Sequence, residues 1–274
     1  MELTGDQLEK AEEELRRYFP KSQLVYGTLV LNKRVRADPV KFIVDKWPEF
    51  RVFICKPQCL QEDDLFRDTL IFTTDPAALK EIVENSSVID WTKYMRLGID
   101  LCHVDVLKGM ASEKNVSSNK ITVCNVMTLQ DMSRLPPIDS ISSGISLGSL
   151  DESYVDLVAQ TWKFGKGGAA KNMIRNMIVN FPSCCVLDAD RKPVSWILTF
   201  SDCSMGMLNT LQEHRQKGYA KVVTITLARR LHAEGYPVYC LVEQQHESNI
   251  RLLKEVGFTE DPSYRLIWFE LNDL

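Results

Sequence analysis

The segment that most constrains the fold is a predicted strand that leads through a tight turn into a long helix. We expect the strand at residues 205–210 and the helix from about residue 216 to residue 233. Four apolar residues at helical spacing would form the buried stripe of that helix: Ala220, Val223, Leu227 and Leu231. A strand that feeds directly into such a helix predicts a layer in which the helix packs on a sheet.

The turn between this strand and this helix carries the pattern Arg215-x-x-Gly218-x-Ala220. Free N–H groups and the positive end of the helix dipole converge at a helix N-terminus, so the turn predicts a site for a pyrophosphate. Gly218 and Ala220 would let the backbone approach the ligand closely, and Arg215 and Lys217 would add positive charge. The pattern alone is a weak signal, because three loosely fixed positions recur by chance in helices.

A second segment further along the chain strengthens this interpretation. A strand is predicted at residues 237–242, and a helix follows at residues 247–256 and ends in Gly257-Phe258. Asn249 lies in the first turn of that helix. In this order and spacing, the two segments resemble the two halves of an acyl-CoA site of the GNAT superfamily.

The remaining strand and helix signals alternate along the chain. Strands are predicted at residues 24–31, 51–55, 68–74, 121–127, 145–150, 184–187, 194–200 and 265–271. Helices are predicted at residues 8–18, 76–83, 152–162 and 169–180, with Asp151 as the N-cap of the third. This order predicts an α+β fold with a mixed central sheet flanked by helices.

A polar, turn-rich stretch at residues 110–148, with Pro136-Pro137 and a Ser/Gly cluster, predicts a linker or a seam between two domains. We therefore expect an N-terminal α/β domain at residues 1–135 and a C-terminal catalytic domain at residues 136–274. The N-terminal domain is a candidate for a degenerate relative of the C-terminal one.

The net charge, the hydropathy and the cysteines limit the classes of partner and of metal site that we expect. The net charge of −4 gives no sign of a nucleic-acid partner, and no apolar run is long enough to span a bilayer. Cys55 and Cys59 have no matching Cys or His pair, so we expect no metal site. The acidic amphipathic segment at the start argues against a cleavable mitochondrial presequence.

Several further motifs carry a family resemblance that extends over nearly the whole chain. They are Val25-Tyr26-Gly27-Thr28, Val44-Asp45-Lys46-Trp47-Pro48-Glu49-Phe50, Asp90-Trp91, Trp162 with Gly167-Gly168, Phe181-Pro182-Ser183-Cys184-Cys185 and Pro193-Val194-Ser195-Trp196. On these motifs the chain resembles the glycine N-acyltransferase family of vertebrates, which lies within the GNAT superfamily.

The resemblance implies a GNAT fold, acyl-CoA as cosubstrate with no permanently bound cofactor, and direct transfer of the acyl group to the amine of glycine. It places the coenzyme on Leu208, Thr210, Arg215, Gln216, Lys217, Gly218, Tyr219, Ala220 and Asn249. The backbone N–H of Leu208 or Asn209 would hold the developing oxyanion. The family also suggests a mitochondrial location, with the cytoplasm as the alternative, and we expect a monomer.

The acceptor pocket is expected where the loop at residues 162–168 meets the strand ends at Trp196 and Leu208. Gly167 and Gly168 would let the backbone pass close to the glycine carboxylate. A neighbouring cation would hold that carboxylate, and position favours Lys166 over Lys163 and Lys171.

Two positions depart from the pattern of the family. Ser204 stands where glycine N-acyltransferases have a Glu that acts as the general base, and a serine hydroxyl cannot deprotonate an ammonium group unaided. Leu253 stands where many GNAT enzymes have a Tyr that protonates the leaving thiolate. Loss of the base costs about 10²–10⁴ in rate if nothing replaces it.

Three functions therefore remain open. The first is an acyl-CoA:glycine N-acyltransferase. The second is a GNAT enzyme that acylates another amine, such as another amino acid or a protein N-terminus. The third, favoured by Ser204, is a catalytically weak protein that binds acyl-CoA.

Overall fold

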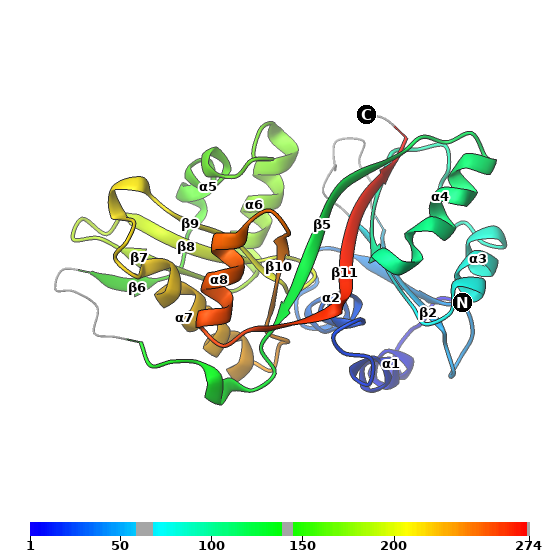
Figure 1. The fold of residues 1–274 in the computed structure, drawn as a ribbon, viewed down its shortest axis with the longest axis horizontal. Coiled ribbons are helices and arrows are strands. Elements are labelled where there is room, and N and C mark those ends of the chain that lie inside the picture. Colours follow the sequence, from blue (N-terminus) through cyan, green and yellow to red (C-terminus); the bar gives the residue numbers. More distant parts are fainter. Residues whose placement is uncertain (59–67, 139–144, 273–274) are drawn as a thin grey trace. The chain divides into compact units, whose positions relative to one another are not determined.

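The computed structural model describes residues 1–58, 68–138 and 145–272, and its residues group into two compact units (Figure 1). The N-terminal unit combines Met1–Val126 with Val242–Gln245 and Glu260–Leu274. The C-terminal unit combines Met127–Leu241 with His246–Thr259. The domain division at residues 135 and 136 stays a prediction, and the Ser/Gly cluster of the predicted linker lies outside the described residues.

The N-terminal unit is built on strands in the order β1-β2-β3-β4-β11-β5. These strands are β1 (Val40–Val44), β2 (Val52–Pro57), β3 (Thr69–Thr73), β4 (Met95–Asp100), β5 (Ser118–Thr128) and β11 (Thr259–Leu271). The β1–β2, β2–β3 and β4–β11 pairs are antiparallel, and the β3–β4 pair is parallel. The sheet of this unit is therefore mixed, as the sequence predicts.

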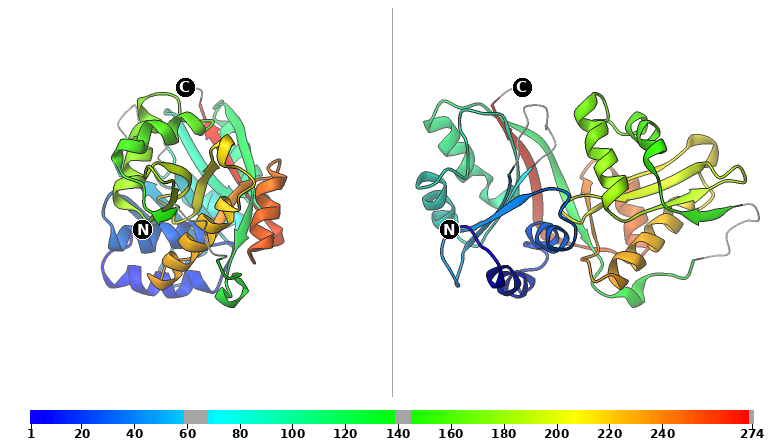
Figure 2. Two further views of the ribbon diagram at one scale, coloured as in Figure 1. Left: turned by 90° about the vertical axis from the view of Figure 1, so that its left-hand side faces the viewer. Right: turned by 180° about the vertical axis from the view of Figure 1, so that it is seen from behind.

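Helices cover both faces of these strands. They are α1 (Asp6–Arg16), α2 (Gln23–Arg34), α3 (Pro76–Glu84) and α4 (Val104–Glu113). The first two pack on each other, as do the last two, and the pairs lie on different sides of the strands (Figure 2). Because α2 and α3 both contact β3, every residue of β3 is buried. The sequence of a strand that is covered on both faces is a nearly continuous apolar run.

Helix α2 corrects one prediction. The sequence predicts a strand at residues 24–31, but every residue from Gln23 to Leu31 is buried within this helix. An apolar run that is buried all round has no polar face to reveal its period, so strand and helix cannot be told apart from the pattern. The hydroxyl of Thr28 donates to the carbonyl of Leu24 (2.9 Å), so this polar side chain is satisfied inside the core.

The C-terminal unit carries strands in the order β10-β9-β8-β7-β6. These are β6 (Ser146–Gly148), β7 (Ser183–Leu187), β8 (Pro193–Thr199), β9 (Met205–Thr210) and β10 (Tyr239–Glu243). The β6–β7, β7–β8 and β8–β9 pairs are antiparallel, whereas β9 and β10 are parallel. Together with the N-terminal unit, this arrangement confirms the α+β fold with a mixed sheet and flanking helices.

The helices of this unit are α5 (Val155–Thr161), α6 (Gly168–Asn180), α7 (Tyr219–Ala233) and α8 (Glu247–Glu255). Helix α7 packs against β7, β8 and β9, and α6 packs against β8 (Figure 2). The predicted stripe of α7 is confirmed for Val223, Leu227 and Leu231, which are buried. Within the part of the chain that the structure describes, no helix has the length and apolar character needed to cross a bilayer.

The start of α7 differs from the prediction. The sequence predicts that it begins near residue 216, but the helix begins at Tyr219. Gln216 and Gly218 have φ values of 61° and 76°, which a right-handed helix does not accommodate. The turn is therefore longer than the pattern indicates.

Gly165, in the loop between α5 and α6, provides a test of the fold. A Cβ atom at this position would lie 1.9 Å from the carbonyl oxygen of Ala159, so the backbone would have to shift. We expect Gly165→Ala to lower the free energy of unfolding by about 1–3 kcal/mol in chemical denaturation.

Gly109→Ala is the matched control for this substitution. Gly109 lies inside α4, and nothing lies within 4 Å of the position of its missing Cβ. This substitution should stabilise the protein by about 0.5–1 kcal/mol, because alanine loses less backbone entropy in a helix than glycine does. Equal unfolding midpoints for Gly165→Ala and the wild type would contradict the close approach of Gly165 to the carbonyl of Ala159.

Candidate active site

Strand β9 contains a β-bulge in its middle. Across the β8–β9 ladder, Trp196 pairs with Asn209 and Leu198 pairs with Gly206, so β9 has one residue more than β8 between these pairs. Met207, in the bulge, has a φ of 51°. A bulge interrupts the ladder and leaves backbone groups without a partner on the neighbouring strand. Such groups are then available to a ligand.

The residues after the bulge are only partly covered. Met205 is buried, whereas Gly206 to Thr210 are half-buried. The hydroxyl of Ser195 on β8 donates to the carbonyl of Asn209 (3.1 Å) and lies 2.8 Å from the hydroxyl of Thr210. These contacts fix the end of β9 against β8. On the other edge, the described residues pair β9 with β10 only at Met205, so the edge beyond the bulge is left for another partner.

The turn from β9 into α7 presents a helix N-terminus to solvent. Gly218 adopts a left-handed conformation (φ 76°, ψ 1°), and no side chain caps the helix. The first intrahelical bond runs from the N–H of Val222 to the carbonyl of Gly218 (3.1 Å), so the N–H groups of the preceding turn have no partner within the helix. Nothing lies within 4 Å of where a Cβ of Gly218 would be.

The predicted phosphate-binding residues lie together in this turn. Arg215, Gln216, Lys217 and Gly218 are exposed, Ala220 is half-buried and Tyr219 is buried. The guanidinium of Arg215 donates from Nε to the carbonyl of Thr210 (3.2 Å), which connects the turn to the end of β9. Charge, free N–H groups and open space therefore meet at one helix end, as anion binding requires.

The remaining predicted positions lie on α8. Asn249 is half-buried in the first turn of α8, and its backbone N–H donates to the carbonyl of His246 (3.0 Å). Leu253 is buried one turn later, so its side chain packs in the core.

Ser204 lies at the end of the turn that joins β8 to β9, and a carboxyl group that the sequence analysis missed lies against it. The side chain of Asp202 accepts hydrogen bonds from the backbone N–H (2.8 Å) and from the hydroxyl of Ser204. Ser204 is 2% exposed and Asp202 is 7% exposed. Burial raises the pKa of the Asp202 carboxyl above its usual range, although both bonds to Ser204 oppose the shift.

Asp202 is the one carboxylate residue that is buried among the described residues. The phenol of Tyr239 on β10 donates to the backbone carbonyl of Asp202, which further fixes the turn. Nothing in the local sequence indicates this burial, because Asp in a short polar turn normally faces solvent.

The loop between α5 and α6 presents Lys166, Gly167 and Gly168 to solvent. Gly167 has a φ of 94° and precedes the first residue of α6. Lys171 is paired with Asp156 (2.7 Å), and the ammonium of Lys163 lies 4.6 Å from the centroid of the Phe164 ring. Within the described residues, Lys166 makes no ion pair or hydrogen bond, so its ammonium is available to a ligand.

Comparison of the sequence with protein families and with individual proteins identifies the same family in both parts of the chain. Residues 3–182 match the aralkyl acyl-CoA:amino acid N-acyltransferase family, and residues 184–269 match the C-terminal region of that family. A glycine N-acyltransferase of Mus musculus aligns at 30% identity, and the alignment covers 92% of this chain and 91% of the relative.

Solved structures agree with this result at the level of the fold. The X-ray structure of a Drosophila protein aligns with a TM-score of 0.81 at 16% identity and covers 100% of this chain and 98% of the other. A tandem GNAT protein from the clavulanic acid biosynthesis pathway aligns with a TM-score of 0.55 at 12% identity, over 97% of this chain and 94% of the other. The likeness to GNAT proteins therefore extends over both compact units.

The two family matches are contiguous, and together they account for nearly every described element of both units. The chain has the GNAT fold, and it belongs to the aralkyl acyl-CoA:amino acid N-acyltransferase family of acyltransferases, which use acyl-CoA as cosubstrate.

Proposed function

We propose that this enzyme transfers the acyl group of an acyl-CoA to the amine of glycine and releases N-acylglycine and coenzyme A. The observation that carries the proposal is the alignment with a relative named glycine N-acyltransferase over 92% of the chain, which includes both units. The open N-terminus of α7 beside the bulged β9 supports the acyl-CoA part of the proposal, because it offers a pyrophosphate site next to free backbone groups.

The geometry of β9 favours one of the two predicted oxyanion donors. Successive N–H groups along a strand point to opposite edges. The N–H of Leu211 donates to Val194 of β8 (2.9 Å), so that of Asn209 points toward β8 as well. The N–H groups of Leu208 and Thr210 then point to the free edge, where the pantetheine arm would pair. We assign the thioester oxygen to the N–H of Leu208, which would stabilise the negative charge that develops there.

The amine of glycine arrives as an ammonium group at neutral pH and must lose a proton before it attacks the thioester carbon. We assign that proton to the carboxylate of Asp202, which receives it through the hydroxyl of Ser204. The free amine attacks the thioester carbon and forms the C–N bond. The C–S bond then breaks, the nitrogen gives up its second proton to solvent as it becomes the amide, and coenzyme A leaves as a thiolate that takes up a proton from solvent. A carboxyl with a raised pKa is a better proton acceptor near neutral pH than an ordinary one.

A matrix of acyl-CoAs and amino acids tests the proposal, with release of the coenzyme A thiol and product mass as readouts. We expect glycine to give the highest kcat/KM and N-acylglycine as the product. A higher kcat/KM for another amino acid or for a peptide N-terminus would instead favour a GNAT enzyme that acylates another amine. Binding of acyl-CoA without turnover would favour a catalytically weak protein that binds acyl-CoA.

Substitutions in the first turn of α7 test the coenzyme site. Ala220→Glu places a carboxylate where the pyrophosphate would lie, and Gly218→Asp adds a charge and strains a residue with a φ of 76°. We expect both to abolish detectable acyl-CoA binding in calorimetry. The matched control is Ala233→Glu at the exposed C-terminal end of the same helix, which should bind acyl-CoA as the wild type does. Wild-type affinity in Ala220→Glu would refute the site.

Asp202→Asn tests the proposed base, because the amide oxygen can still accept the bond from the N–H of Ser204. We expect kcat for glycine to fall about 10²–10⁴-fold with little change in acyl-CoA affinity. Ser204→Ala should lower kcat in the same direction, and Ser204→Glu should restore activity to Asp202→Asn. Wild-type kcat in Asp202→Asn would exclude this carboxyl as the base.

Asp202→Asn should also change how stability depends on pH. The folded pKa is raised, so the folded protein retains this proton at pH values where the unfolded chain has lost it. The contribution of Asp202 to stability therefore falls as the pH rises from about 4, the usual value for Asp, toward the raised folded value. Denaturation across this range should show a smaller loss of stability in Asp202→Asn than in the wild type.

Lys166→Ala tests the acceptor site. Loss of a charged hydrogen bond to the glycine carboxylate costs about 1.5–3 kcal/mol, so KM for glycine should rise about 10- to 100-fold while acyl-CoA affinity is retained. Lys171→Ala is the matched control, because Lys171 already pairs with Asp156. An unchanged KM for glycine in Lys166→Ala would remove this residue from the acceptor pocket.

A further inference from the structure

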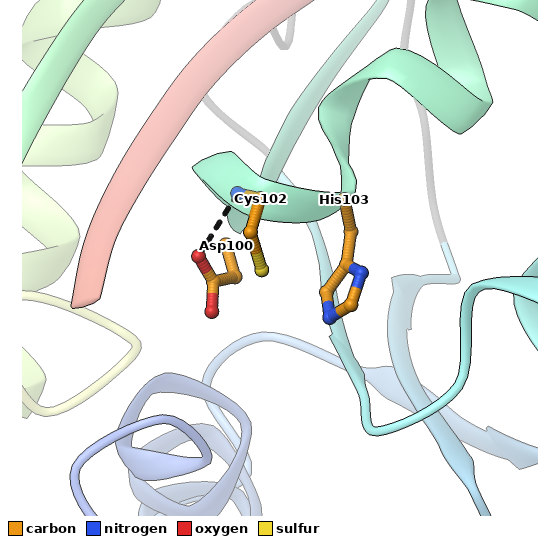
Figure 3. Close-up of side chains that lie close together, drawn as sticks. All are labelled: Asp100, Cys102 and His103. Carbon is orange, nitrogen blue, oxygen red and sulfur yellow. Dashed lines mark hydrogen bonds between the residues drawn. The ribbon is translucent and has the colours of Figure 1, made fainter. Parts of the chain in front are cut away.

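A group of possible metal ligands lies in the N-terminal unit, away from the residues assigned to acyl transfer. Strand β4 ends at Asp100, and a short 3₁₀ turn follows at Leu101–His103. One ligand atom each of Asp100, Cys102 and His103 lies within 4.8 Å of the other two. Figure 3 shows the three side chains projecting from the same side of this turn, with the sulfur between the carboxylate and the imidazole ring.

We propose that Asp100, Cys102 and His103 bind a zinc-class divalent cation. No metal site is expected from the sequence, because Cys55 and Cys59 have no matching Cys or His pair and His103, which follows Cys102, is expected to be packed rather than to bind a metal. Asp100, Cys102 and His103 offer one oxygen, one sulfur and one nitrogen, which is the mixture of ligands that zinc accepts. Magnesium and calcium prefer oxygen ligands alone, so they are poor candidates.

The local structure holds one ligand in place and leaves an oxygen for the ion. Oδ1 of Asp100 accepts a hydrogen bond from the backbone N–H of Cys102 (3.1 Å), which fixes the carboxylate at the start of the turn. A carboxylate has two oxygens, so Oδ2 remains available for a cation. The antiparallel pairing of Asp100 with Leu266 of β11 fixes the backbone beneath this carboxylate.

The donor atoms need a small rearrangement to bind zinc. In a tetrahedral site with bonds of about 2.0–2.3 Å, the ligand atoms lie about 3.3–3.8 Å apart. Cys102 is exposed and His103 is half-buried, so rotation of these two side chains can close the remaining gap. Their exposure also gives an ion access from solvent. The three ligands leave a fourth position for water.

Binding of a cation here would release the proton of the Cys102 thiol to solvent, because a thiol that coordinates a metal is deprotonated. The site would therefore exchange one proton for one ion.

Titration of the full-length, metal-free protein with Co²⁺ tests the proposal. We expect one Co²⁺ per chain, an absorption band from charge transfer between thiolate and metal, and loss of this band when Zn²⁺ is added. Cys102→Ser should abolish the band. His103→Ala and Asp100→Asn should each weaken Zn²⁺ binding by at least about tenfold, since even second-shell changes cost 10- to 100-fold.

His232→Ala, on the exposed surface of α7, is the matched control and should bind both ions as the wild type does. Cys102→Ser removes only one sulfur from an exposed turn, so its thermal unfolding without metal should match that of the wild type. Zn²⁺ should raise the unfolding temperature of the wild type and not that of Cys102→Ser. A thiolate band that survives in Cys102→Ser, or no bound Co²⁺ in the wild type, would overturn the proposal.

Discussion

The left-handed conformation of Gly218 is the constraint on which the proposed coenzyme site depends. It ends the turn after β9 and sets the start of α7 at Tyr219. A residue with a Cβ atom is strained at this φ, so the position requires glycine or a residue that tolerates the left-handed region. Because the buried side chains of Val223, Leu227 and Leu231 dock α7 on the sheet, the exposed N–H groups at its beginning have a fixed direction.

The bulge in β9 provides the second half of the same arrangement. It interrupts the pairing with β8 near Met207, while Ser195 fixes the end of the strand by its contacts with Asn209 and Thr210. A rigid strand with free backbone groups next to an open helix N-terminus can bind an extended, phosphorylated ligand without rearrangement, which lowers the entropic cost of binding. The buried carboxyl of Asp202 lies just before this strand and accepts a hydrogen bond from Ser204, the residue that stands in place of the general base of the family.

The sequence predicted those features that follow from local pattern. The bounds of β9, the buried stripe of α7 and the α+β fold follow from apolar spacing and from turn residues. Helix α2 was predicted wrongly because burial on all sides removes the periodic signal. The start of α7 was placed too early because the conformation of Gln216 is set by the turn and not by its own propensity.

The site residues that the sequence missed depend on burial and on side-chain direction. Asp202 is unusual only because the turn lies inside the protein, and Asp100, Cys102 and His103 converge only because a 3₁₀ turn follows β4. Neither property can be read from residue order. The coenzyme motifs, by contrast, can be recognised in the sequence, because glycine and small residues indicate where the backbone can approach a ligand closely.

Hydrogen–deuterium exchange of the full-length protein, with and without acyl-CoA, tests the central claim most directly. Bound acyl-CoA should slow the exchange of the N–H groups of Leu208 and Thr210 on β9. It should also slow the exchange of the N–H groups at the start of α7 that have no partner within the helix, from Tyr219 to Lys221. Peptides from α1 and from the exposed end of α7 should exchange at unchanged rates. Unchanged exchange at β9 and at the start of α7, with protection elsewhere in the chain, would contradict the account.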